Sequence, residues 1–430
     1  MKNQGILAAL LASCFALSAC NGGSSNKDDN PSTGTETPEP QPETVSATFV
    51  DSSVSGLQYQ CSSSTDVHLT DARGVLTCEI GDTVTFFVGS IELGSTVMNE
   101  DTVFITPATL VGDNTNEATD AVLNMARLLI SLDIDQDPSN GIAIDESSLQ
   151  DIGVVLEFDQ TSENFESAVE SIMTQLTDEL PEGPYTLVDA GEAQGHLVLG
   201  LYIQYAGLYD GTVDFGDTVT RLTFVVSREG YAYGTNESAD GIYANAANDE
   251  LAGPFDTLGN FESFKVDGST GATYFVPATI DNGVLSGTEE NGLVSFTATR
   301  QLIFDPVIDS ALVEQFSALL PLTIHLDDNR SFSFADEALD GFPFGLLAGG
   351  TPHSDNAAND PRFWDINVAE VVSTRDDTVR LIAIAMNGFV LDIAVDLSGE
   401  TPSVQANWTH VHEGTEGTAT GFETEHSSIF

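Results

Sequence analysis

The stretch TYFVPATIDNGVLSGTEENGLVSFTATR, residues 273–300, reads as three strands joined by two tight turns. Apolar and polar residues alternate through it, as in strands with one buried face. The two interruptions are DNG (residues 281–283) and ENG (residues 290–292), and Asn-Gly favours the two-residue turn of a β-hairpin. This stretch therefore predicts an antiparallel β-fold around it.

The same pattern extends from about residue 196 to the C-terminus, in segments such as HLVLGLYIQYAGLYDGTV, TRLTFVVSREGYAYGT, RLIAIAM and FVLDIAVDL. Strands at regular spacing predict a sandwich or an up-and-down barrel. We expect residues 190–430 to form a larger antiparallel β-barrel or sandwich, either as one domain or as two joined near 305–320.

Residues 45–106 contain short strand patterns punctuated by Gly, Asp and Ser, among them VSATFV, GVLTCEI and TVTFFVGSIEL. They predict a small N-terminal β-sandwich. Residues 107–189 have helical spacing instead, and we interpret them as a short helical connecting region. One apolar face runs from Ala121 to Leu132 and a second from Phe165 to Leu180. The chain as a whole is expected to be mainly β.

The composition is extremely acidic, with 67 Asp plus Glu against 12 Lys plus Arg and a formal net charge of −55. Such a surface repels nucleic acid and anionic lipid, and suits water of high ionic strength. Nucleic acid is therefore excluded as a partner.

The N-terminus carries a secretory pattern, with Lys2 before an apolar run that begins at Ile6. In LASCFALSAC, residues 11–20, both Cys14 and Cys20 end a plausible processing box. A cut before Cys14 leaves too short an apolar run, so we predict cleavage before Cys20. This stretch resembles a bacterial lipoprotein signal, which implies acylation of Cys20 and stable anchoring by more than one chain. The alternative is an ordinary secretory signal with chance cysteines.

Residues 20–44 are rich in Gly, Ser, Pro, Thr and acids, and 21–44 lack aromatic and aliphatic side chains. They predict a disordered tether between lipid and fold. Asn21 does not match the aspartate of an inner-membrane retention signal, so we expect the outer membrane, on either face. The remaining cysteines, Cys61 and Cys78, are predicted to form a disulfide outside the cytoplasm.

Two patterns raise the question of a metal. Asp133, Asp135 and Asp137 alternate as at the start of an EF-hand loop, but Pro138 replaces the invariant glycine and Ile144 the bidentate acid. We favour an acidic, solvated loop that caps a helix. Trp408, His410 and His412 alternate on a strand, where a His-x-His pair can chelate zinc or copper. Packing or hydrogen bonding is the preferred reading, and we predict no metal and no cofactor.

Catalytic motifs are sparse. The chain has no G-x-S-x-G elbow, and the S-x-x-K pair of Ser24 and Lys27 lies in the tether. The 67 acids offer many carboxylate pairs that glycoside hydrolysis could use, and the sequence does not choose among them. Aromatic residues recur at the predicted strand positions. We predict that they form the core of a barrel, and the alternative is that they line a ligand cleft. They are Tyr202, Tyr205, Tyr209, Phe224, Tyr231, Tyr233 and Tyr243.

Three segments resemble known modules. VSGLQYQC, LTDARGVLTC and DTVTFFVG together are similar to prealbumin-like or carboxypeptidase-regulatory-like sandwiches, which are spacers or binding elements. Residues 105–144 resemble a segment of gammaproteobacterial surface lipoproteins of unassigned function, which implies no catalytic residues. The rhythm of DNGVLSGTEENGLVSFTATR resembles calycin-type barrels of surface lipoproteins, including transferrin-binding ones.

Together these patterns predict a lipid-anchored envelope protein with a non-catalytic binding or structural role. The membrane is its partner through the anchor, with an extracellular ligand or protein as a further partner. The alternative is a secreted-type hydrolase that acts on polysaccharide through an acid pair.

Overall fold

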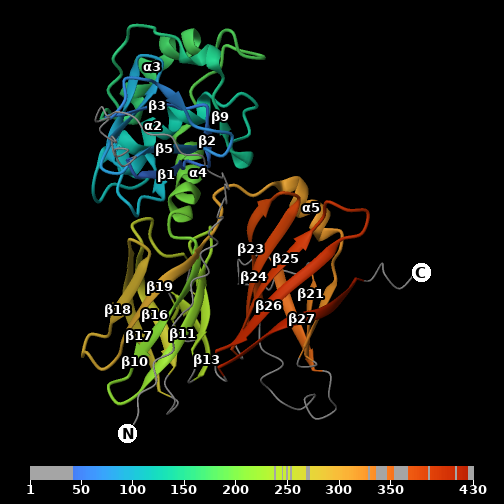
Figure 1. Ribbon diagram of the computed structural model, residues 1–430. Coiled ribbons are helices and arrows are strands. Elements are labelled where there is room, and N and C mark those ends of the chain that lie inside the picture. Colours follow the sequence, from blue (N-terminus) through green and yellow to red (C-terminus); the bar gives the residue numbers. More distant parts are fainter. Residues whose placement is uncertain are drawn as a thin grey trace, which may run out of the picture. The chain divides into compact units, whose positions relative to one another are not determined.

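The computed structural model describes residues 42–236, 239–244, 246–247, 250–251, 254–267, 272–327, 330–335, 346–352, 367–385, 388–411 and 414–424. Within these ranges the chain is mainly β, which confirms the predicted fold class (Figure 1). No helix among these residues has both the length and the apolar character needed to cross a membrane. Cys14 and Cys20, as well as Ser24 and Lys27, lie outside the described residues.

The N-terminal part contains two facing sheets, with strand orders β5-β1-β8 and β4-β3-β6-β7. Their bounds are β1 Thr44–Phe49, β3 Gln58–Cys61, β4 His68–Leu69, β5 Val75–Glu79, β6 Thr83–Val88, β7 Ile91–Val97 and β8 Phe104–Ile105. The structure contains the predicted disulfide, which joins Cys61 of β3 to Cys78 of β5 across a Cα–Cα distance of 5.7 Å. The bond thus links one sheet of the sandwich to the other.

Helices cover this sandwich. The elements that follow it are α1 Pro107–Val111, α2 Asp120–Ser131, η1 Pro138–Asn140, β9 Ile142–Ala143, η2 Glu146–Leu149 and α3 Ser162–Thr177, and β9 pairs with β2 Val54–Ser55. Both predicted apolar helices are confirmed as α2 and α3, although Leu132 and Leu180 fall just beyond their ends. Met125, Phe165 and Ile172 pack in the same core as Phe49 and Phe86. Residues 107–189 therefore belong to the N-terminal folding unit rather than forming a separate connection.

The helix α4 (Ala190–Ile203) corrects the expectation that strands begin near residue 196. Asp189 caps its N-terminus by accepting hydrogen bonds from the amides of Gly191 and Glu192. Apolar side chains surround this helix because it is buried on several sides, so it lacks the one-sided pattern that identifies a helix. Leu197 and Leu201 pack with α1 and α2, while Tyr202 packs in the next core along the chain.

Residues 207–303 form a closed antiparallel barrel in the order β10-β11-β12-β13-β16-β17-β18-β19, with β19 pairing back to β10. Its strands are β10 Gly207–Asp214, β11 Val219–Val226, β12 Ala232–Asn236, β13 Ala239–Ala244, β16 Asn260–Asp267, β17 Thr273–Asp281, β18 Val284–Thr288 and β19 Ser295–Ile303; the short strands β14 Ala246–Ala247 and β15 Glu250–Leu251 pair separately. The predicted DNG hairpin is confirmed, since Asn282 and Gly283 have φ of 48° and 71° between β17 and β18.

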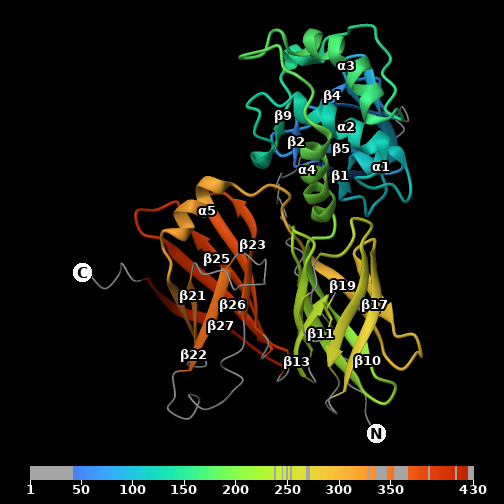
Figure 2. The same ribbon diagram turned by 180° about the vertical axis from the view of Figure 1, so that it is seen from behind.

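A second closed barrel follows, in the order β20-β21-β22-β23-β24-β25-β26-β27 (Figure 2). Its strands are β20 Leu322–Leu326, β21 Arg330–Ala335, β22 Leu346–Pro352, β23 Asn367–Arg375, β24 Thr378–Ala385, β25 Phe389–Asp396, β26 Ser403–His410 and β27 Thr415–Thr424. The segment 304–321, which contains α5 Ser310–Ser317, joins the two barrels. Of the two arrangements left open for residues 190–430, the structure therefore contains two barrels.

Both barrels are filled by their own side chains. The first encloses a cluster of aromatic and aliphatic groups, among them Tyr209, Phe224, Phe261, Phe264 and Phe296. The second encloses Phe332, Phe389, Leu391 and Trp408 with their neighbours. Inward positions alternate with exposed ones along β17 and β26, as expected for barrel strands.

Candidate functional site

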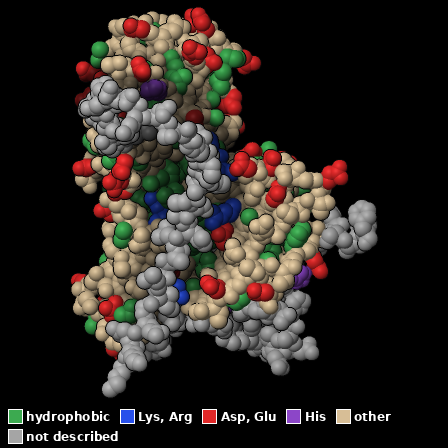
Figure 3. All heavy atoms as spheres, viewed as in Figure 1, with side chains coloured by type: hydrophobic (Ala, Val, Ile, Leu, Met, Phe, Trp, Pro, Cys, Tyr) green, Lys and Arg blue, Asp and Glu red, His purple; other side chains and the backbone are tan. Residues whose placement is uncertain are grey.

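Arginine side chains gather where the modules are joined, although basic residues are scarce in this chain. From the side shown in Figure 3, most visible Lys and Arg groups lie near the middle of the view, while Asp and Glu are scattered elsewhere. We call the group of Arg73, Arg228, Asp305, Glu370, Ser373 and Arg375 the junction. Its members come from the sandwich, the first barrel, the linker and β23.

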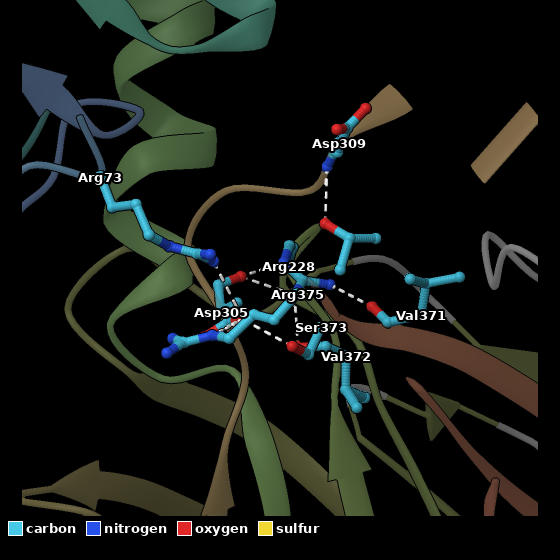
Figure 4. Close-up of polar contacts among 9 residues, drawn as sticks. Arg73, Arg228, Asp305, Asp309, Val371, Val372, Ser373 and Arg375 are labelled. Atoms are coloured by element: carbon cyan, nitrogen blue, oxygen red, sulfur yellow. Dashed lines mark hydrogen bonds and ion pairs between the residues drawn. The ribbon is translucent and has the colours of Figure 1, made fainter. Parts of the chain in front are cut away.

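Asp305 lies at the centre of the junction (Figure 4). Its Oδ2 atom accepts hydrogen bonds from Ser373 Oγ at 2.7 Å, Arg375 Nε at 2.6 Å and Arg73 Nη2 at 3.1 Å. Arg375 Nη2 also pairs with Oδ1. Burial by itself would raise the pKa of Asp305, but these hydrogen bonds and the two arginine charges outweigh it and hold the pKa below its ordinary value. Asp305 is therefore a stable carboxylate that links three modules.

Arg228 extends this arrangement with hydrogen bonds to backbone carbonyls. Its Nε and Nη2 donate to the Asp305 carbonyl at 3.0 and 2.6 Å, and Nη1 donates to the Val371 carbonyl at 2.6 Å. Nη1 also lies 3.6 Å from the carboxylate of Glu370. Burial raises the pKa of Glu370 to about 8, the Glu229 charge adds to this, and Arg228 opposes it. The guanidinium thus ties β23 of the second barrel to the linker.

An apolar cluster beside the junction joins the two barrels directly. Val225 and Tyr233 of the first barrel pack with Val372, Ile382 and Ile384 of the second. The junction's arginines and Asp305 bond to protein partners, and a shared apolar core lies next to them. This arrangement fixes modules to one another, and its chemistry is that of a structural joint.

A small cleft of about 240 Å³ lies close by, lined by residues that include Ser52, His196, Arg228 and Glu229. Ser52 has a φ of 51°, and its Oγ lies 3.0 Å from His196 Nε2. A serine hydroxyl beside a histidine is the arrangement found where a histidine base activates a serine nucleophile. However, His196 Nε2 also lies 3.2 Å from the carbonyl oxygen of Asp51.

The histidine contact decides against catalysis by this pair. A carbonyl oxygen only accepts, so His196 Nε2 carries the proton in that hydrogen bond. A protonated Nε2 cannot take the proton of Ser52. Burial also lowers the pKa of His196, which favours the neutral ring. The pair therefore holds the turn at residues 51–53 against α4.

Several predicted residues are placed in the cores. Trp408 and His410 share the inward face of β26, as predicted, and Trp408 Nε1 donates to Asp327 at 2.9 Å. His412 lies outside the described residues. Among the described residues, the grouping with metal-ligand spacing is Cys61, Cys78 and Asp82, whose cysteines are already oxidised to a disulfide.

The aromatic positions are divided among several environments. Tyr209 and Phe224 stack inside the first barrel, with ring centroids 5.0 Å apart. Tyr202 lies on α4 and donates a hydrogen bond to the Phe255 carbonyl at 2.7 Å. Tyr233 contributes to the core between the barrels. Tyr205 and Tyr231 pack at the margins of these clusters, and the Tyr243 side chain is outside the described residues.

The acidic loop departs from its predicted form. Asp135 and Asp137 are exposed as expected, but Asp133 is completely buried, so the interpretation of a solvated loop is wrong at that residue. Asp133 is buried because it forms an isolated bridge with Ile144, which the sequence pattern could not indicate. The junction was also missed, because its residues are spread from 73 to 375 and have no common motif.

Comparisons of the chain with family models, with curated proteins and with solved structures find no match.

Proposed function

We propose that this chain is a lipid-anchored protein of the bacterial outer membrane, with a non-catalytic binding or structural role in the envelope. The observation that carries the proposal is that each barrel encloses an apolar core of its own side chains. A carrier of small apolar ligands needs an open interior. A filled barrel offers its outer surface instead, so the partner that fits it is a macromolecule.

The junction supports the same role. Its arginines are bound by Asp305, Glu370 and backbone carbonyls, which leaves a joint between modules instead of a reactive centre. Three modules joined by these contacts, on the predicted lipidated tether, can present a surface away from the membrane. The net charge of −55 favours neutral or cationic partners over nucleic acid.

We predict lipidation at Cys20. In cells fed labelled palmitate, the Cys20→Ser variant should lose the label and leave the membrane fraction, since the acyl chains supply the anchor. The Cys14→Ser variant should keep both the label and the location. The opposite pattern would move the mature start to residue 14, and label on both variants would exclude a single lipidated cysteine.

Hydrolysis of polysaccharide is the second candidate. The observation that favours it is the buried Glu370, whose pKa of about 8 makes it a proton donor at neutral pH, near the charge of Glu229. Glu370 is 7% exposed and lies 3.6 Å from Arg228, however, and it is not among the residues that line the cleft. An acid pair for glycoside hydrolysis must flank an accessible substrate.

A turnover screen separates the two candidates. The full-length protein, assayed against neutral and sulfated polysaccharides and chromogenic esters, is expected to give no product above a boiled control. The variants Glu229→Gln, Glu370→Gln and Ser52→Ala are assayed in parallel. Product that disappears in one of these variants, while its circular dichroism spectrum is unchanged, would replace the binding role by a hydrolase.

A further inference from the structure

Asp133 has a buried carboxyl group, and one of its two oxygens lacks a hydrogen-bond partner. The residue is 0% exposed, and its Oδ1 accepts a hydrogen bond from the Ala143 amide at 2.8 Å. Its Oδ2 is buried and has no hydrogen-bond partner in the structure. A buried polar atom without a partner is costly, and such atoms commonly indicate an ion or water held at that point.

The unpartnered oxygen belongs to a pair of interacting carboxyl groups. Asp133 and Asp135 lie close enough to interact as like charges. Asp135 is held in place by the amide of Asp137 and by Asn140 Nδ2, each at 3.0 Å. Two ionised carboxylates repel one another, and a cation between them would relieve that repulsion.

The loop geometry distinguishes this pair from an EF-hand. Ile144, at the position of the bidentate acid, is buried and bridged to Asp133, while Asp145 caps η2 by accepting from Ser147. A cation here would take ligands from Asp133 and Asp135 and complete its shell with carbonyl or water oxygens. Calcium tolerates such irregular shells of oxygen ligands, whereas magnesium demands a near-ideal octahedron.

We propose that Asp133 and Asp135 form the carboxylate pair of a calcium site in the loop between α2 and β9. This inference is independent of the proposed envelope role. The site would neutralise the buried carboxyl group and fasten the end of α2 to the short β2–β9 pairing. Its effect would be to stabilise the N-terminal unit.

Tyr185 provides a local reporter for this site. Its hydroxyl donates to the Pro181 carbonyl at 2.5 Å, and the hydroxyl oxygen lies 3.2 Å from the carbonyl oxygen of Ile134, between the two aspartates. A terbium ion that replaces calcium beside Ile134 would be sensitised by this tyrosine. Emission excited through tyrosine therefore reports binding at the loop rather than elsewhere on the acidic surface.

The test is a terbium titration of the full-length protein, followed by displacement with calcium, magnesium or sodium at matched ionic strength. We expect one saturable site, displaced by calcium in the millimolar range or below and much less well by magnesium. Asp135→Asn should weaken binding on the order of tenfold, because ligand charge sets the affinity. The exposed Glu163→Gln variant removes the same charge on α3 and should bind as the wild type does.

Two further variants complete the design. Tyr185→Phe should lose the sensitised emission but keep the calcium-dependent rise in Tm, which places the ion at the loop. Asp133→Asn should abolish the rise in Tm, and the exposed Asp135→Asn serves if that variant does not fold. Equal weakening by Asp135→Asn and Glu163→Gln, or equal displacement by all three metals, would show general screening and overturn the proposal.

Discussion

Replacing Asp51 by asparagine is expected to stabilise the N-terminal unit by about 4 kcal/mol at pH 8, and to change its stability little at pH 4. Asp51 is 0% exposed, and neither of its carboxylate oxygens has a hydrogen-bond partner in the structure. The helix α4 covers it closely, since a Cβ at Gly200 would stand 3.2 Å from the Asp51 Cα. Burial raises the pKa of Asp51 from 3.8 to about 7.

The direction of this stability change depends on whether the folded or the unfolded chain loses the Asp51 proton at the lower pH. As the pH rises above 3.8, the unfolded chain ionises Asp51 while the folded protein keeps the proton until about pH 7. The wild type therefore loses stability between these values, and the loss is complete above pH 7. Asparagine cannot ionise, so the variant escapes this loss.

Hydrogen exchange of the β1 amides measures the effect on the N-terminal unit alone; the Phe49 amide, for example, donates to the Gly74 carbonyl. The matched control is Asp66→Asn, an exposed aspartate of the same module. Protection in the Asp51 variant should exceed that of the wild type increasingly as the pH rises from 4 to 8. Parallel curves for Asp51→Asn and Asp66→Asn would contradict the raised pKa.

Replacing Arg228 by methionine is expected to cost about 3–5 kcal/mol, because several buried backbone carbonyls lose their donor at about 1–3 kcal/mol each. The guanidinium is 14% exposed and donates to the carbonyls of Asp305, Val371 and Val372. Methionine keeps much of the volume and none of the donors. Glu370 would then stay buried as the uncharged acid, since Arg228 is the group that opposes the rise of its pKa.

Calorimetry of the full-length protein should show the second barrel melting at a lower temperature, or separating from the first, in this variant. The control is Arg380→Met on the same sheet. Its partner is Asp392, and the two side chains are 38% and 37% exposed. Pairs of this kind contribute about 0–1 kcal/mol. Equal destabilisation by the two substitutions would show that the junction is not the joint between the barrels.

Local patterns in the sequence were sufficient for much of the fold. The Asn282-Gly283 turn requires positive φ at both positions, so it predicts its hairpin without help from distant residues. The faces of α2 and α3 could be read because each helix buries one side only. The pairing of Cys61 with Cys78 followed from there being two cysteines left to pair.

What only the tertiary structure decided depends on contacts between distant residues. The sequence predicts strand where the helix α4 lies, because apolar residues fall on more than one of its sides, and its C-terminal half packs against two cores. The choice of two barrels depends on β10 pairing with β19 and β20 with β27, across about a hundred residues in each case. The junction joins Arg73 to Asp305, and no short-range pattern records such a contact.

The aspartates also show which properties the sequence determines and which depend on the tertiary structure. From the sequence alone, 67 acids are equivalent as surface charges. The fold buries Asp51 under α4 and Asp133 against Ile144, and it surrounds Asp305 with arginines. Composition determined that the surface would be acidic, but desolvation and partners set the pKa of each carboxyl group, and these exist only once distant segments have packed together.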